Sequence, residues 1–206
     1  VAELRMQLFY APGLCSLAPH IALARTGEAF SLTRVDMATR LTEDGLDFRD
    51  IKRSGKIPAL RLASGEVLTE TLAILLYVAD LAPGSGLAPP AGSFERYLFT
   101  DLLGFISSEI HKSFVPLFSK GAPQAAKAAA RAEVLRHLEA LEACLHERSY
   151  CFGQAFTVAD AYLFCILGWA PLCGIELAAF PSLSRFRERI AAENGVSEAL
   201  RAEGLL

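Results

Sequence analysis

Cys15 and Ser16 lie at the predicted junction between a first strand and a first helix, directly after a Pro-Gly loop. The free N–H groups of a helix N-terminus favour an anion, so a thiolate at this position would be stabilised. A cysteine in such a place is a candidate for chemistry or for binding a ligand sulfur. The alternative is that Cys15 is one more small buried apolar residue, which is common for cysteine.

Two further pairs of residues could hold other parts of the same ligand. Ile57-Pro58 precedes a strand, and a cis bond there would turn the Ile57 N–H and C=O toward an extended peptide. Glu70-Thr71 precedes a helix and offers a carboxylate for an ammonium group, beside N–H groups and a hydroxyl for a carboxylate. The alternatives are an ordinary trans proline turn, and a helix cap at Thr71 or Thr69 with Glu70 as a first-turn acid.

Together these sites describe a ligand with an amino-acid end, a peptide middle and a thiol, and glutathione is such a molecule. Cationic side chains around the proline could bind its glycine carboxylate, although each is equally explained as solvated surface. These side chains are Arg40, Lys52, Arg53 and Lys56.

The elements that must position these residues alternate between strand and helix patterns. They are a strand ending at Tyr10, a helix from Ser16 to its C-cap Gly27, a strand over 30–35, an irregular segment over 37–52, a hairpin over 59–68 and a helix over 71–81. The order βαβ, loose helix, ββα predicts a thioredoxin-like α/β domain in which a parallel pair is extended by an antiparallel hairpin.

Segment 83–92 is dense in Pro, Gly and Ser and is predicted to link two domains. We expect residues 6–82 to form the thioredoxin-like, glutathione-binding domain and residues 93–206 to form an all-helical domain. Helices are expected from Ser93 to about Phe118, from Pro123 to His146 and from Pro181 to about Asn194.

Thr157 and Asp160 have the spacing of a capping box, which we interpret as structural. It precedes the apolar stretch 161–175, which is shorter than the roughly 20 residues of a membrane span and contains Gly168 and Pro171. A buried core helix is the better interpretation, and no membrane role is expected.

Composition excludes several other classes. The 206 residues are 52% hydrophobic and 21% charged, which is typical of a globular protein. The net charge of -3 argues against a nucleic-acid partner, which would require a basic face. Val1 to Arg5 shows no signal-peptide pattern, and we expect a cytoplasmic protein.

Five cysteines without a CxxC pair favour free thiols in a reducing compartment over a disulfide framework. Cys144, Cys151, Cys165 and Cys173, even with His137 and His146 nearby, lack the usual zinc spacing, so no metal is predicted.

Nearly the whole chain from Met6 onward resembles a known family. The segments that carry the resemblance are MQLFYAPGLCSLAPHIAL (Met6 to Leu23), GKIPAL (Gly55 to Leu60), LTETLAILLYVADLAP (Leu68 to Pro83), FISSEIHKSF (Phe105 to Phe114) and FTVADAYLF (Phe156 to Phe164). By these motifs the sequence is similar to the bacterial, cysteine-type (beta-class) cytosolic glutathione transferases.

The resemblance implies a homodimer that uses glutathione as co-substrate and a small hydrophobic electrophile as partner. It places Cys15 beside the glutathione sulfur, main-chain bonds at Ile57, and the γ-glutamyl group at Glu70 and Thr71. It also nominates His111 near the sulfur and Lys112 toward the ligand. The resemblance also implies that the all-helical domain carries a second, apolar pocket for the electrophile, with Phe114 and Trp169 as lining residues.

The chain departs from the family pattern at three places. Lys52 to Lys56 form a more basic loop than the usual one, Gly104 replaces an asparagine that helps bind glutathione, and Gly168 replaces an arginine before Trp169.

The expected activity is conjugation of the glutathione thiol to an electrophilic carbon. One alternative is glutathione-dependent disulfide exchange, reduction or dehalogenation, with Cys15 as the attacking thiolate. The other is a binding or regulatory protein that keeps the fold without turnover.

Overall fold

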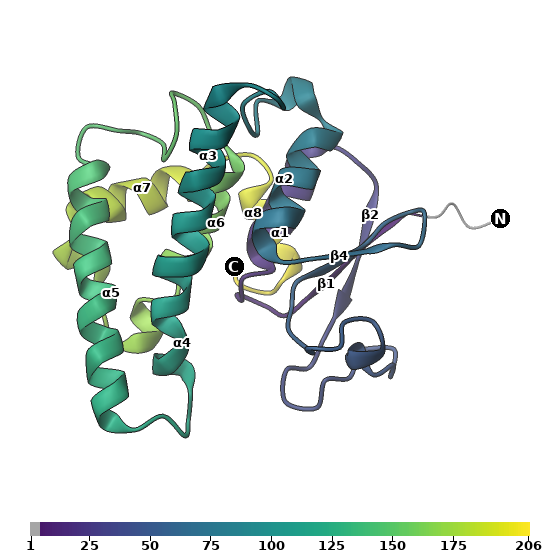
Figure 1. Ribbon diagram of the computed structural model, residues 1–206, viewed down its shortest axis with the longest axis horizontal. Coiled ribbons are helices and arrows are strands. Elements are labelled where there is room, and N and C mark those ends of the chain that lie inside the picture. Colours follow the sequence, from purple (N-terminus) through teal and green to yellow (C-terminus); the bar gives the residue numbers. More distant parts are fainter. Residues whose placement is uncertain (1–4) are drawn as a thin grey trace.

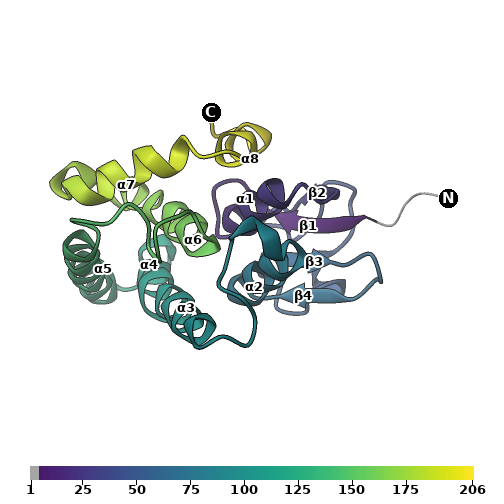
Figure 2. The same ribbon diagram turned by 90° about the horizontal axis from the view of Figure 1, so that it is seen from above.

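The computed structural model describes residues 5–206 and consists of a small α/β unit followed by a helical unit (Figure 1). Residues 1–4, and with them the prediction about a signal peptide, lie outside the described residues. Helices α1 and α2 lie between the sheet and the helical unit, where both pack against α6 (Figure 2). The predicted fold class is confirmed.

The sheet has four strands in the order β2-β1-β3-β4. They are β1 (Met6–Tyr10), β2 (Phe30–Arg34), β3 (Ala59–Arg61) and β4 (Val67–Thr69), accompanied by the helices α1 (Leu17–Thr26) and α2 (Thr71–Leu81). β1 pairs in parallel with β2, while β3 is antiparallel to both β1 and β4. The predicted parallel pair and hairpin are therefore confirmed, and Gly27 ends α1 in the left-handed conformation as expected.

The helical unit begins with one long helical run. Its parts are α3 (Phe94–Phe105), a π-helical segment (Ile106–His111) and α4 (Lys112–Phe118). The sequence predicted a single helix over this span and did not indicate the π-helical segment. The remaining helices are α5 (Gln124–Cys144), α6 (Val158–Leu167), α7 (Pro181–Ala191) and α8 (Val196–Ala202).

Helix α6 is the buried core helix that the apolar stretch predicts, because every one of its residues is buried. The Asp160 carboxylate accepts the Thr157 N–H at 2.8 Å, as expected for the capping box. It also accepts the Cys151 N–H at 2.7 Å, which ties down the preceding loop. Within residues 5–206, no helix is both long and apolar enough to cross a membrane.

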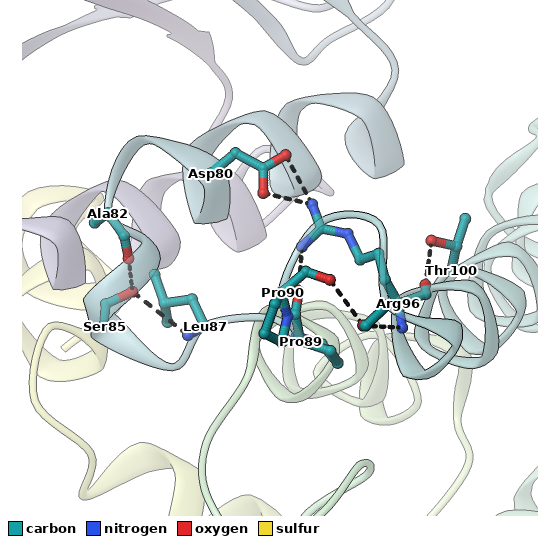
Figure 3. A network of polar contacts seen from close by, with 9 residues as sticks. Asp80, Ala82, Ser85, Leu87, Pro89, Pro90, Arg96 and Thr100 are labelled. Atoms are coloured by element: carbon teal, nitrogen blue, oxygen red, sulfur yellow. Dashed lines mark hydrogen bonds and ion pairs between the residues drawn. The ribbon is translucent and has the colours of Figure 1, made fainter.

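Arg96 on α3 fastens the two units together (Figure 3). Its guanidinium bonds both carboxylate oxygens of Asp80 on α2, at 2.7 and 2.8 Å, and the carbonyl of Pro89 at 2.8 Å. Ser93 caps α3 by accepting the Arg96 N–H at 3.1 Å, as predicted. These contacts hold the segment between the two units in place. The domain limits at residues 82 and 93 stay a prediction.

One hydrophobic core continues from the inner face of the sheet through α1, α2 and α6 to α7. A smaller cluster covers the other face of the sheet, with Phe9, Phe48 and Ile57 among its members. Because Ile57 is anchored in this second cluster, the loop that carries it is held firmly against the sheet.

Candidate active site

A cavity of about 650 Å³ lies where the end of β1, the loop before β3 and the start of α2 face the π-helical segment and α4. It brings together all the predicted site residues except Phe114, namely Cys15, Arg40, Lys56, Ile57, Pro58, Glu70, Thr71, His111, Lys112 and Trp169. One wall comes from the α/β unit and the other from the helical unit.

Cys15 lies on the first wall and is 9% exposed. Burial raises the pKa of its thiol to about 11, although a hydrogen bond with Thr71 and the charge of Lys52 act in the opposite direction. The thiol donates to the Ile57 carbonyl oxygen at 3.5 Å. The prediction of a stabilised thiolate is therefore wrong for the free protein, because desolvation outweighs the start of the helix.

The loop before Cys15 is held by side chains from distant parts of the chain. The Gly13 N–H donates to the Glu203 carboxylate at 2.8 Å, and the Gly13 carbonyl accepts from Trp169 Nε1 at 2.8 Å. Ser16 does not cap α1, since its hydroxyl exchanges hydrogen bonds with the backbone of Ala11. These contacts fix where the Cys15 sulfur meets the cavity.

Glu203 was missed by sequence reasoning. Its carboxylate is fully buried, and Oε1 lies 2.9 Å from His20 Nδ1 on α1. A buried carboxylate requires such partners, because an unpaired one would cost several kcal/mol. Nothing in the sequence near Glu203 indicates these partners, so no local signal could have found it.

The Ile57-Pro58 peptide bond is cis, which confirms that prediction. Within residues 5–206, the Ile57 N–H finds no acceptor, and its carbonyl has only the long bond from Cys15. Both residues line the cavity. The main chain of Ile57 therefore has hydrogen-bonding capacity left for an extended peptide.

Glu70 occupies the position before α2 with φ +72, a left-handed conformation that is strained for a residue with a side chain. Its carboxylate is 80% exposed and lies 3.4 Å from Lys52 Nζ. Thr71 is buried at the first position of α2, and no side chain caps this helix. The alternative of a simple helix cap is therefore not what the structure shows.

The basic residues of the loop border the same wall. Arg40 also has a positive φ, and its side chain packs against Gly55, where an added Cβ would lie 3.4 Å from Arg40 Cδ. Lys52 Nζ reaches the Pro58 carbonyl at 3.4 Å, which ties it to the cis bond. Arg40, Lys52 and Lys56 line the cavity, whereas Arg53 does not.

The second wall is aromatic and apolar. His111 Nδ1 lies 2.8 Å from the Tyr162 hydroxyl, and its ring meets the edge of Trp169 at 4.9 Å between centroids. Burial lowers the pKa of His111 to about 4, so the imidazole is neutral at pH 7. Val115 and Phe118 complete this wall.

Phe114 does not line the cavity, which corrects the prediction. Its side chain is fully buried behind Trp169, with the ring centroids 5.9 Å apart. His111, Val115 and Phe118 follow the i, i+4, i+7 spacing of one helix face, and Phe114 lies on the adjacent face toward the core. Phe118 takes its place, 5.8 Å from Trp169.

Comparisons with known proteins agree with this geometry. The N-terminal domain model of glutathione S-transferase matches residues 14–81, and the C-terminal domain model matches residues 105–194. The chain is 40% identical over 200 residues to glutathione S-transferase GstA of Escherichia coli O157:H7, covering 97% of this chain and 100% of the relative. The chain belongs to the glutathione S-transferase family.

Solved structures narrow this assignment. A sphingomonad glutathione S-transferase complexed with glutathione is 52% identical, with a TM-score of 0.94 over 97% of this chain and 100% of that one. The bacterial beta-class glutathione S-transferase of Sphingomonas chungbukensis is 51% identical, with a TM-score of 0.95 and the same coverage. The resemblance to the bacterial beta class is confirmed.

Several residues that line the cavity were not predicted from the sequence. They are Leu14, Met37, Ser107, Val115, Phe118 and Tyr162. Tyr162 carries the one side-chain hydroxyl of α6, and this hydroxyl in an apolar helix was a usable signal. The others had none, because their orientation depends on how the two units pack.

Gly104 interrupts helix α3 without a steric reason inside the chain. A Cβ at this position would meet no atom within 4 Å among the described residues. Glycine in a helix costs about 0.5 to 1 kcal/mol relative to alanine. Nothing among the described residues explains that cost, and Gly104 does not line the cavity.

Proposed function

We propose that this enzyme binds glutathione along the wall formed by Cys15, Ile57 and Glu70 and transfers its sulfur to a small apolar electrophile held at the opposite wall. The observation that carries the proposal is the single cavity in which unsatisfied peptide and charged groups face Val115, Phe118 and Trp169. Glutathione is a polar peptide that matches the first wall, and an apolar electrophile matches the second.

The polar wall has a partner for each part of glutathione. The exposed carboxylate of Glu70, which Lys52 approaches at 3.4 Å, can bind the ammonium group. The uncapped start of α2 with Thr71 suits the neighbouring carboxylate. Ile57 offers its N–H and C=O to the cysteinyl backbone. Arg40 and Lys56 lie at the rim where the glycine carboxylate would end.

The protonated Cys15 suggests a specific role in catalysis. A thiol with a pKa of about 11 is a hydrogen-bond donor at pH 7, so it can stabilise the thiolate of glutathione beside it. Neutral His111 can exchange a second hydrogen bond with the same sulfur. The glutathione thiol releases its proton to solvent, its sulfur bonds to the electrophilic carbon, and the leaving group departs with the bonding electron pair.

Chemistry that uses Cys15 as the attacking thiolate is less well supported. That reaction requires ionisation of a buried thiol whose pKa burial has raised, and only a small fraction is thiolate at neutral pH. The Thr71 hydrogen bond and the charge of Lys52 offset this burial only in part. We therefore keep conjugation as the proposed reaction.

We also propose that the enzyme is a homodimer in the cytoplasm. Phe94, Tyr97, Leu98 and Phe105 form an exposed apolar face on α3, with Phe94 75% and Tyr97 68% exposed. Their i, i+3, i+4, i+11 spacing places them on one side of the helix. Such a face is covered in most soluble proteins, and a second copy of this chain is the occupant expected from the resemblance.

Calorimetry with Glu70→Gln tests the binding mode. Loss of the charged partner should weaken glutathione binding by about 1.5 to 3 kcal/mol. Glu66→Gln is the matched control, since Glu66 is an exposed acid on the neighbouring hairpin outside the cavity. Unchanged affinity in Glu70→Gln, or no conjugation by the wild type with any aryl halide, would overturn the proposal.

A further inference from the structure

The charges that line the cavity are unbalanced. The cations are Arg40, Lys52, Lys56 and Lys112, and the carboxylate is that of Glu70. Cys15 and His111 are both neutral at pH 7 because they are buried. Counted among the described residues, the side chains that line the cavity therefore carry a net charge of +3 before any ligand binds.

Glutathione, placed as proposed above, offsets only part of this excess, on the polar wall. Its ammonium group belongs with Glu70, which Lys52 also approaches at 3.4 Å. Its glycine carboxylate belongs with Arg40 or Lys56, on the loop beside Ile57. The bound peptide therefore meets the loop cations, and its formal charge of -1 leaves part of the positive excess uncompensated.

Lys112 is the cavity cation that lies outside this arrangement, on the opposite wall. It begins α4 directly after His111, on the helix that supplies Val115 and Phe118 to the apolar wall. Within residues 5–206, its ammonium group has no ion pair and no hydrogen bond to another side chain. A cation without a partner at the edge of an apolar subsite favours a ligand that combines an apolar body with a negative charge.

We propose that the preferred electrophile carries a carboxylate or a similar anionic group, which Lys112 binds while the apolar body lies against Trp169 and Phe118. This inference rests on the proposed glutathione transfer. For an aryl chloride, the thiolate sulfur of glutathione bonds to the ring carbon, and chloride leaves with the electron pair of the broken bond. The anionic group takes no part in these bonds and acts only through binding.

A matched pair of electrophiles tests the proposal. We would compare 4-chloro-3,5-dinitrobenzoate with its methyl ester, dividing each kcat/KM by the uncatalysed rate with glutathione. The wild type should favour the carboxylate by about fivefold, the value expected for one partly exposed ion pair. Raising the salt concentration should reduce this preference.

Variants assign the preference to one side chain. Lys112→Met should abolish the preference for the carboxylate, and Lys112→Arg should keep it. Lys120→Met is the matched control, because Lys120 follows the same helix but lies outside the cavity, and it should leave the preference unchanged. Equal corrected rates in the wild type would overturn the inference, as would a preference that survives in Lys112→Met.

Two outcomes separate this inference from the proposal on which it rests. If Lys112→Met raises the KM for glutathione equally with both electrophiles and keeps the preference, Lys112 binds glutathione and the inference is wrong. If the wild type conjugates neither electrophile, the proposed function fails. Binding of unreactive 3,5-dinitrobenzoate and its methyl ester, measured by calorimetry with S-methylglutathione present, then still decides whether Lys112 selects the anion.

Discussion

Cys15 belongs to the hydrophobic core, and its thiol donates to the Ile57 carbonyl oxygen, which does not stabilise a negative charge. Burial therefore outweighs the Thr71 hydrogen bond and the charge of Lys52, both of which lower the pKa of the thiol. The consequence is a cysteine that donates a hydrogen bond at neutral pH. Its reactivity toward alkylating reagents should therefore differ from that of a catalytic thiolate.

We expect alkylation of Cys15 by iodoacetamide to increase about tenfold for each pH unit between pH 8 and pH 10, without levelling off. The reason is that the thiolate fraction keeps growing until the pH reaches the pKa of about 11. Peptide mass spectrometry would measure the rate at this residue, with the exposed Cys144 as an internal check on the reagent. A plateau near pH 7 would show that Cys15 is a thiolate.

His111 should make stability depend on pH. Its folded pKa of about 4 is below the value of 6.5 for an unburied histidine, so the unfolded chain binds more protons between these values. The stabilisation is complete above pH 6.5 and is lost as the pH falls toward 4.

Chemical denaturation of His111→Gln would measure this contribution. Between pH 7 and pH 4.5, we expect the free energy of unfolding to fall by about 2 kcal/mol less in the variant than in the wild type. Equal losses in the two proteins would mean that His111 is solvated in the folded state.

Much of the polar wall was predictable from the sequence because its residues adjoin the ends of predicted elements. Cys15, Ile57 and Glu70 each lie where a strand or helix begins, and such positions follow from local patterns. Phe114 was misplaced because local spacing does not decide which of two adjacent helix faces meets a cavity. The role of Glu203 could not be predicted because its partners are far away in the sequence.

At the scale of elements, the capping box of α6 is the best-defined local structure. Asp160 accepts bonds from two backbone N–H groups and from the Thr157 hydroxyl while fully buried. Asparagine would place an NH2 group where Asp160 has an accepting oxygen. That group would face another donor, and both would lack an acceptor.

Asp160→Asn should lower the free energy of unfolding by about 2 kcal/mol or more, measured by urea denaturation. The effect should appear in stability, with the affinity for glutathione unchanged in the fraction that stays folded, because Asp160 is remote from the cavity lining. Asp101→Asn, an exposed acid on α3, is the control and should change stability by less than about 0.5 kcal/mol. A stable Asp160→Asn variant would contradict the capping role.

The π-helical segment shows the limit of prediction at this scale. Hydrophobic spacing indicated one continuous helix from Ser93 to Phe118, and the chain is indeed helical throughout. A π-helical turn keeps the chain helical, and the residue types of one short turn do not distinguish it from a turn of α-helix. The segment lies directly before Lys112, and its residues Ser107 and His111 line the cavity.

At the scale of the whole molecule, the exposed apolar face of α3 leads to a prediction about the proposed dimer. Phe94→Glu combined with Leu98→Glu should convert dimers to monomers, because each buried unpaired charge opposes association. The dissociation constant should rise by about 100-fold or more, as measured by light scattering after gel filtration. Leu172→Glu, at an equally exposed residue outside this face, should leave the dimer intact. A persistent dimer in the double variant would place the interface elsewhere.

The overall arrangement of two units was predictable, since the strand and helix patterns and the Pro-rich segment 83–92 mark it in the sequence. The contact that links the two units was not predictable. In the sequence, Asp80 and Arg96 resemble ordinary surface charges, and only the packed structure brings them together. Contacts between units depend on orientation, which local patterns do not encode.

The hydrogen bond from Gly13 to Glu203 joins residues 190 positions apart. A ribosome adds about 5 to 20 residues per second, so Gly13 is synthesised about 10 to 40 seconds before its partner exists. During that interval β1 and α1 can form, while the loop before Cys15 lacks its acceptor. A nascent chain that has not yet reached Glu203 therefore carries every polar group of the cavity wall nearest Cys15, but not the anchor that fixes the sulfur in place.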